Sequence, residues 1–288
     1  MSMIATDDDK WDIQIKSTSG LFEIDVKEIW RYRDLLVMFI VKDIVTRYKQ
    51  TILGPLWFML QPVLSALIYV IIFTRVAKIS TSGAPPMLFY LGSLTLWNYF
   101  SETFSIISKT FAENAAVLGK VYFPRLVLPL ARTLSGLLKL LMQFAIFAVV
   151  LLYHIFVTHR VAPNWYALTF PLLLILIALF SLGAGLLVTS LTSKYKDLTF
   201  MILFGIQLYM YVTPVLYPLS IAPPDKQFIL WLNPLTSYFE MFKYSFLGEQ
   251  SGVLNFYWLG YSVAFTLLMF MAGLMMFSKV EKKFIDTI

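Results

Sequence analysis

The chain has 288 residues, of which 59% are hydrophobic, 17% aromatic and only 14% charged, and its mean hydropathy is +0.74. Ordinary water-soluble domains carry about 25% charged residues, so this composition excludes a soluble domain and indicates a membrane protein. With no cysteine, the chain cannot form disulfides or thiolate metal sites, and its two histidines are too few to hold a metal by themselves. The net charge of +6 is interpreted as orienting the chain in a membrane, not as binding nucleic acid.

The N-terminal stretch is predicted to stay in the cytoplasm. Its opening, MSMIATDDDKWD, has acids where a secretory signal has basic residues, so no cleaved signal is expected. Residues 21–49 are charged too often to cross a bilayer, but apolar residues recur among the charges at Ile29, Leu36, Phe39 and Ile40. This pattern predicts an amphipathic helix that lies in the membrane interface.

The segment RYKQTILGPLWFMLQP, at residues 47–62, predicts an elbow between that helix and the first membrane span. The two basic residues at its start would lie at the anionic inner surface, and Gly54-Pro55 would end the in-plane helix. Trp57 would anchor the start of the span among the lipid headgroups.

Six apolar segments are long enough to cross about 30 Å of hydrocarbon, which takes about 20 residues. They cover residues 56–77, 87–108, 131–157, 165–191, 198–217 and 256–278. Most of the 23 lysines and arginines lie in the N-terminal stretch and in the connections on the same side, so both termini are predicted to be cytoplasmic. The predicted domains are a cytoplasmic segment with the interface helix at 1–55, a six-span membrane domain at 56–278 and a cytoplasmic tail at 279–288.

The connection between the fifth and sixth spans, residues 218–255, is rich in aromatic residues but is interrupted by Pro223, Pro224 and Pro234. Neither half is long enough to span, so a re-entrant helical hairpin that dips into the outer leaflet is predicted. The predicted fold class is an all-α integral membrane protein with six transmembrane helices, an N-terminal amphipathic interface helix and this hairpin.

The second span carries a polar side when it is drawn as a helical wheel at about 100° per residue. That side consists of Asn98, Ser101, Glu102, Ser105 and Lys109. A carboxylate that faces lipid is costly, so this side is predicted to face protein or water. It either borders a conduit or forms a hydrogen-bonded seam between helices, and the sequence leaves both interpretations open.

Three cations, Arg125, Arg132 and Lys139, are seven residues apart and share one helix face. Such a row could bind a diphosphate that comes in from the cytoplasm, through charge-assisted hydrogen bonds. The uninterrupted apolar stretch begins only at Leu140, so the three cations could equally lie in cytoplasm and among headgroups.

Aromatic residues are further candidates, because the C–H faces of sugars stack on aromatic rings. The predicted channel-lining residues are Trp97, Asn98, Tyr99, Glu102, Tyr209, Tyr211 and Tyr217, with Trp231 and Tyr238 as a predicted outer gate. The alternative for each ring is a place in the protein core or in the aromatic belt at the membrane surface.

The chain carries no G-x-x-x-x-G-K-[ST] pattern, so ATP-driven work would need an ATPase on another chain. No Ser/His/Asp set, carboxylate pair or metal-ligand cluster converges by spacing, and an enzyme is therefore not predicted.

Several motifs resemble those of the membrane subunits of bacterial polysaccharide ABC exporters, the type-2 class that handles O-antigen, capsule and wall teichoic acid. They are RYKQTILGPLWFMLQP at 47–62, VYFPRLVLPL at 121–130, KYKDL at 194–198, TPVLYP at 213–218 and NPLTSYFEMFKYSFLG at 233–248. The likeness covers roughly residues 30–280 in the same order. Lys49 and Lys243 stand where the family often has arginine, which removes the planar fork that makes bidentate contacts.

The resemblance implies a homodimer in the bacterial cytoplasmic (inner) membrane that pairs with two copies of an ATPase subunit. The cargo that it implies is a polyprenyl-diphosphate-linked polysaccharide, with O-antigen as the first expectation. ATP and Mg would be held by the partner subunit, and no cofactor, metal or nucleic acid is expected on this chain.

In such exporters the N-terminal helix and the loop at 109–125 contact the ATPase. The implied coupling residues are Arg31, Arg33, Asp34, Arg47, Glu113, Asn114 and Lys120. The alternative for the loop is a solvated turn with orienting positive charges.

Three rival functions remain open at this point. A type-2 exporter could carry another cargo, such as teichoic acid, a drug or a lipid, and the conduit for a drug or a lipid would be narrower and less polar. A membrane enzyme acting on polyprenyl-linked sugars would need convergent carboxylates or a metal, and Glu102 alone is weak support for it. A secondary transporter would show inverted repeats and paired intramembrane acids, and neither is evident.

Overall fold

The computed structural model describes residues 26–49, 54, 56–111, 113–114, 123–192 and 197–285. Over these residues the chain forms helices joined by turns, without a strand among them, which confirms the predicted all-helical fold. The first half contains α1 (Val26–Arg31), α2 (Arg33–Tyr48), α3 (Leu56–Tyr69), its π-helical continuation η1 (Val70–Val76), α4 (Pro86–Ile107) and α6 (Val127–Phe156). The second half contains η2 (Trp165–Thr169), α7 (Phe170–Thr192), α8 (Leu198–Val212), η3 (Leu219–Ile221), α9 (Gln227–Trp231), α10 (Pro234–Leu247) and α11 (Phe256–Ile285).

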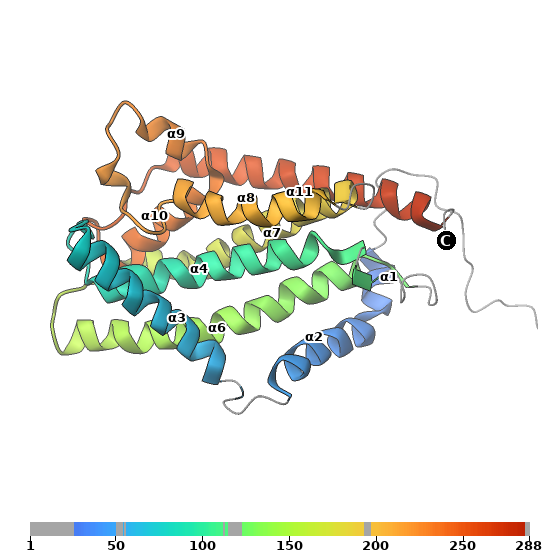
Figure 1. Cartoon of the computed structure of the whole chain (residues 1–288), viewed down its shortest axis with the longest axis horizontal. Helices are drawn as coiled ribbons and strands as arrows, with labels where there is room; N and C mark the ends of the chain where they lie inside the picture. The colour runs from blue at the N-terminus through green and yellow to red at the C-terminus, as the bar shows by residue number, and fades with distance from the viewer. Residues whose placement is uncertain are drawn as a thin grey trace, which may run out of the picture.

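The long helices share one direction. In Figure 1, α4, α6, α7, α8 and α11 run along the long axis of the molecule, and α3 crosses them obliquely. α1 and the C-terminal end of α11 lie at one end of this bundle, and α9 and α10 lie at the opposite end. Four helical segments in the described part are long and apolar enough to cross a membrane, at 56–76, 127–156, 165–192 and 256–281.

α4 and α8 lie beside these four segments but do not reach the same length and apolarity. α8 has only 15 residues, because Pro214 follows and Thr213 already takes the extended backbone that a residue before proline prefers. The predicted fifth span therefore ends at Val212 and not at residue 217. α4 is long enough, but it carries the predicted polar side, and protein surrounds most of it. The six-span count stays a prediction.

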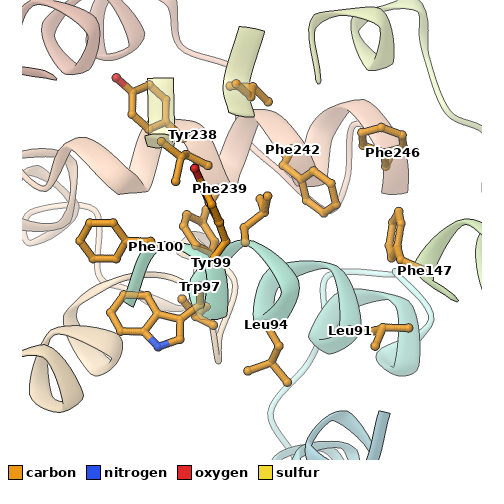
Figure 2. Close-up of a cluster of buried hydrophobic side chains, with 14 of the residues drawn as sticks. Leu91, Leu94, Trp97, Tyr99, Phe100, Phe147, Tyr238, Phe239, Phe242 and Phe246 are labelled. Carbon is orange, nitrogen blue, oxygen red and sulfur yellow. The ribbon is translucent and has the colours of Figure 1, made fainter. Parts of the chain in front are cut away.

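The core is built around α4. Figure 2 shows Tyr238, Phe239, Phe242 and Phe246 from α10 in a row beside α4. The packing includes Phe147 from α6, whose ring centroid lies 5.4 Å from that of Phe242. α4 can keep polar residues because α3, α6, α7, α8 and α10 all contact it.

α2 packs against the bundle with one side and exposes apolar residues on another. Ile29, Leu36 and Phe39 contact a second buried cluster where α6, α7 and α11 meet, so these residues face protein. The large apolar residues that α1 and α2 expose are Trp30, Val37, Met38, Val41 and Val45. The predicted elbow follows: Gly54 has a φ of +51°, which favours glycine, and α3 leaves in a different direction (Figure 1).

α7 and α11 touch through their backbones. A methyl group added at Gly273 would meet the backbone of Gly183, and one added at Gly183 would meet the backbone of Phe270. This close approach lets the two helices pack along much of their length.

Replacing Gly273 with alanine is therefore expected to destabilise the protein by about 1–3 kcal/mol, because the helices must separate. Gly260 lies on the same helix with nothing within 4 Å of an added methyl, so Gly260→Ala should leave stability unchanged or raise it slightly. The check is the thermal midpoint of each variant in detergent, followed by size-exclusion chromatography. Equal midpoints for the two variants would contradict the backbone contact.

Two helices, α9 and α10, form where the hairpin is predicted, and a buried ion pair anchors the second. The Lys243 ammonium contacts the Glu240 carboxylate, and both side chains are almost fully buried. Lys243 also donates to the carbonyl of Pro214 at 3.2 Å, and Glu240 accepts from the backbone N–H of Val253 at 2.9 Å. α10 is thus tied to the segments that follow α8 and precede α11. Whether α9 and α10 dip into the membrane stays a prediction.

Removing one member of this pair leaves the other charge buried, so Glu240→Met is expected to cost about 3–5 kcal/mol. The double variant Glu240→Met with Lys243→Met should recover part of that loss, because neither charge then remains. Thermal unfolding of the purified variants checks this. A double variant less stable than the single one would show that the pair does not act as a unit.

Candidate functional site

A groove of about 720 Å³ lies between α4 and α8 and is open to the surface. Its α4 wall consists of Trp97, Ser101, Glu102 and Ser105. Its α8 wall consists of Leu203, Phe204, Ile206, Gln207, Leu208, Met210 and Tyr211. The groove therefore combines aromatic, aliphatic, hydroxyl and amide groups with a single carboxylate.

The two walls follow from the helical period and from loose packing. Trp97, Ser101 and Ser105 are four residues apart and fall on one side of α4. α8 has one buried residue, Ile206, while Phe204 and Tyr211 are 62% and 63% exposed. α8 thus packs loosely against α4, and the groove between the two helices stays open.

The structure brings three of the predicted channel-lining residues, Trp97, Glu102 and Tyr211, into this groove. Asn98 and Tyr99 turn to another side of α4, where they line a small cavity with Lys139. For all five residues, contact with a cargo stays a prediction.

The other two predicted channel residues support the α8 end of the groove. The Tyr209 hydroxyl donates to Asn233 Oδ1 at 2.5 Å, and its ring centroid lies 6.1 Å from that of Trp97. The Tyr217 hydroxyl donates to the carbonyl of Tyr211 at 3.0 Å. Their role in a conduit also stays a prediction.

The predicted outer-gate residues are buried within the single chain. Trp231 stacks on Trp258 with ring centroids 6.0 Å apart. The Tyr238 hydroxyl contacts the carbonyl of Ser262 at 2.9 Å and Thr266 Oγ1 at 2.7 Å. A gate role would need these contacts to open, and it stays a prediction.

The three cations of the predicted row each contact an acidic residue from a different helix. Arg132 forms an ion pair with Asp43 of α2, which also accepts from Ser135 Oγ at 3.1 Å. Lys139 Nζ lies 2.5 Å from Glu102 Oε2 of α4. The third contact links residue 125 to α11.

Arg125 uses its backbone and its side chain for that link. Its N–H donates to Glu281 Oε1 at 3.3 Å, and its Nη1 donates to the Glu281 carbonyl at 3.1 Å. Burial lowers the pKa of Arg125, and the Glu281 carboxylate acts in the opposite direction. Binding of a diphosphate by this row stays a prediction, and a diphosphate would compete with these acids.

Most of the described coupling candidates lie at the end of the bundle that holds α1. Arg31, Arg33 and Asp34 are exposed on α1 and α2, and Glu113 is exposed just beyond α4. Asn114 donates to the carbonyl of Thr110 at 2.9 Å. Lys120 and the side chain of Arg47 lie outside the described residues.

Sequence reasoning missed Gln207. It lies in the run LTFMILFGIQLYMYV, where it is the only amide among apolar and aromatic residues, and that isolation was the available signal. Ser101 and Ser105 were on the predicted polar side but were not chosen as channel residues.

Comparison with known proteins identifies the class. Residues 35–247 match the ABC-2 type transporter family, and the chain therefore belongs to this family. It is thus a multi-pass membrane protein and a transport subunit, not an enzyme, and its family implies an ATPase partner. The predicted resemblance is confirmed.

Within this family, the chain is similar to proteins whose names state a cargo. Two proteins from Klebsiella pneumoniae, both named O-antigen export system permease protein RfbA, are 29% identical over 253 and 254 residues, which is 88% of this chain and 94% of each relative. A protein of the same name from Myxococcus xanthus is 28% identical over 214 residues, which is 74% of this chain and 80% of that relative.

Proposed function

We propose that this chain is the membrane subunit of an ATP-driven exporter that moves a polyprenyl-diphosphate-linked polysaccharide, with O-antigen as its cargo, across the cytoplasmic membrane. The observation that carries the proposal is the groove between α4 and α8, in a chain of the ABC-2 type transporter family. Tyr211, 63% exposed, offers a ring for sugar C–H faces, and Ser101 and Gln207 offer hydrogen bonds for hydroxyls. Trp97 lies in the groove wall but is buried, so it shapes the wall more than it presents a free ring. The names of the three relatives support the same cargo.

The polarity of the groove favours a polysaccharide over a drug or a lipid. Four of its eleven lining residues are Ser101, Glu102, Ser105 and Gln207. An apolar cargo gains little from such groups, because each must give up its hydrogen bonds to water without replacement. Sugar hydroxyls can replace those bonds.

The conduit forms between two copies of the chain. The groove is open along one side, and α8 exposes Phe204, Leu208 and Tyr211 there. A second copy facing this side would cover the exposed rings and close the groove into a channel. The working unit is therefore a homodimer with two ATPase copies.

Six helices span the membrane, with both termini in the cytoplasm. Four are the long apolar segments, and α4 and α8 complete the set because they run beside them and are shielded by protein or by the second copy. Basic residues gather at the N-terminal side of the bundle, as the positive-inside rule requires. α9 and α10 lie at the outer leaflet. The chain then divides into a cytoplasmic segment at 1–55, a membrane domain at 56–278 and a cytoplasmic tail at 279–288.

ATP and Mg are held by the partner ATPase, which docks on α1, α2 and the loop at 109–125. Arg31, Arg33, Asp34 and Glu113 are exposed there for contact. The Asp43–Arg132 ion pair links α2 to α6, so a movement of α2 reaches the membrane helices directly.

The first test is co-purification. A tagged chain, solubilised in mild detergents, is expected to bring down an ATPase subunit in equal amount and to hydrolyse ATP, as measured by mass spectrometry and phosphate release. Cells that lack the chain should stop displaying the polysaccharide while its lipid-linked form accumulates inside. Recovery of the chain alone from several detergents, with no hydrolysis, would sink the proposal.

A bulky residue in the groove should block export without unfolding the protein. Gln207 is exposed and lines the groove, so Gln207→Trp fills space that a cargo needs. The larger side chain narrows the groove and raises the barrier to passage of the cargo. Because each added barrier of about 1.4 kcal/mol lowers a rate tenfold, a loss in export of about tenfold or more is expected. Leu268→Trp on α11, at a position 69% exposed and outside the groove, is the matched control and should export normally. Surface polysaccharide per cell is the readout, and equal export by both variants would argue against this conduit.

A further inference from the structure

Glu102 is the residue of the groove lining that carries a charge. Its side chain is 30% exposed, and its Oε2 lies 2.5 Å from Lys139 Nζ. Glu102 lines both the groove and a small cavity of about 10 Å³ on the other side of α4. Glu102 therefore lies in the wall between these two spaces, with its Oε2 on Lys139.

Lys139 contacts Glu102 from the side of α4 that faces away from the groove. It lines that small cavity and a second one of about 10 Å³ beside α2 and α3, but it does not line the groove. Its Nζ lies 4.8 Å from the centroid of the Phe58 ring of α3, and its side chain is only 17% exposed. The ammonium is thus held between Phe58 and Glu102, away from a cargo in the groove.

The contact between Lys139 and Glu102 sets the electrostatic potential at the groove surface. Without the ammonium, a carboxylate in the wall would repel any anion in the groove, and the repulsion is strong in a space with little water. With the ammonium in contact, the two charges nearly cancel at the groove surface. Glu102 then keeps its capacity to accept hydrogen bonds from hydroxyls.

We propose that Lys139 is a specificity-determining residue, which neutralises Glu102 from behind the wall so that the groove accepts an anionic cargo. The anionic cargo, a lipid-linked diphosphate or acidic sugars, rests on the proposed function. The cancellation of charge rests on the geometry alone. Neutralising Glu102 is a different role for Lys139 from direct binding of a diphosphate.

Arg132 provides an internal comparison. It lies seven residues earlier on the same face of α6, about 10 Å away along the helix, and it pairs with Asp43 instead of a groove residue. Removing Arg132 together with Asp43 takes away a pair with no net charge, so it should leave the groove potential as it is.

The test uses a cysteine as a local probe of charge, because the natural chain has none. Ser101 precedes Glu102 in the groove wall, and Ser101→Cys supplies the probe. In detergent-purified protein, the reaction rates of an anionic and a cationic methanethiosulfonate reagent of similar size are compared. Ser80→Cys, at an exposed position in the connection between η1 and α4, gives the reference ratio.

Added to the probe, Lys139→Gln is expected to shift the rate ratio towards the cationic reagent by about threefold to tenfold, as one unit charge within about 7 Å predicts. Glu102→Gln should shift it the opposite way. The double variant Glu102→Gln with Lys139→Gln should leave the ratio at its starting value. The control double variant Asp43→Asn with Arg132→Gln should do the same. An unchanged ratio in both single variants would overturn the proposal, and Glu102→Gln still decides the matter if Lys139→Gln fails to fold.

An export assay distinguishes neutralisation of Glu102 from direct contact between Lys139 and the cargo. Lys139→Gln should lower surface polysaccharide in cells that export normally with the unaltered chain, and the double variant should restore it. If the double variant stays as low as Lys139→Gln, Lys139 contacts the cargo directly and the proposal is wrong. If the unaltered chain supports no export but the reagent ratios shift as expected, the proposed function fails while the charge cancellation stands.

Discussion

The constraint on which the structure depends is that α4 carries polar and charged groups at the centre of a membrane protein. Hydrocarbon offers such groups no partner, so every side of α4 must meet protein or water. α3, α6, α7 and α10 supply the protein side, with Lys139 placed against Glu102 and a row of α10 aromatic rings along the helix. The remaining side meets the groove. The location of the candidate site is thus the part of the α4 surface that the other helices leave uncovered.

The bundle divides into a firmly packed part and a loosely held wall. α7 and α11 touch through the backbones of Gly183 and Gly273, and α4 packs against α6 and α7. α8 makes far fewer contacts, buries only Ile206, and is fixed near its C-terminal end through Pro214 and Asn233. A wall that is anchored at one end can swing with a small loss of contacts. This difference suits a conduit that must widen for a polymer.

The sequence predicted features that depend on residues close together in the chain, and it missed features that depend on contacts between distant residues. Apolar runs and prolines are local signals, so the predicted limits of the second span, 87–108, agree with α4 to one residue. The same signals missed the early end of α8, where Pro214 outweighs the apolar run. The partners of the three cations were not predictable, because Arg132 and Asp43 are 89 residues apart and Arg125 and Glu281 are 156 apart, and spacing carries no record of such contacts. Trp97, Glu102 and Tyr211 were chosen for their chemistry, but only helix packing could show that they line the groove. Tyr99 lines the small cavity on the other side of α4 instead, and Tyr238 is buried.

The buried pair of Glu240 and Lys243 sets an order for biosynthesis. Its contacts come from Pro214, from α10 and from the N–H of Val253, which are made by the ribosome in that sequence. The pair is complete only after residue 253 has been synthesised and has reached that end of the bundle. α8 is therefore synthesised well before its C-terminal end is secured, and a nascent chain halted between residues 214 and 253 would hold α8 without this anchor.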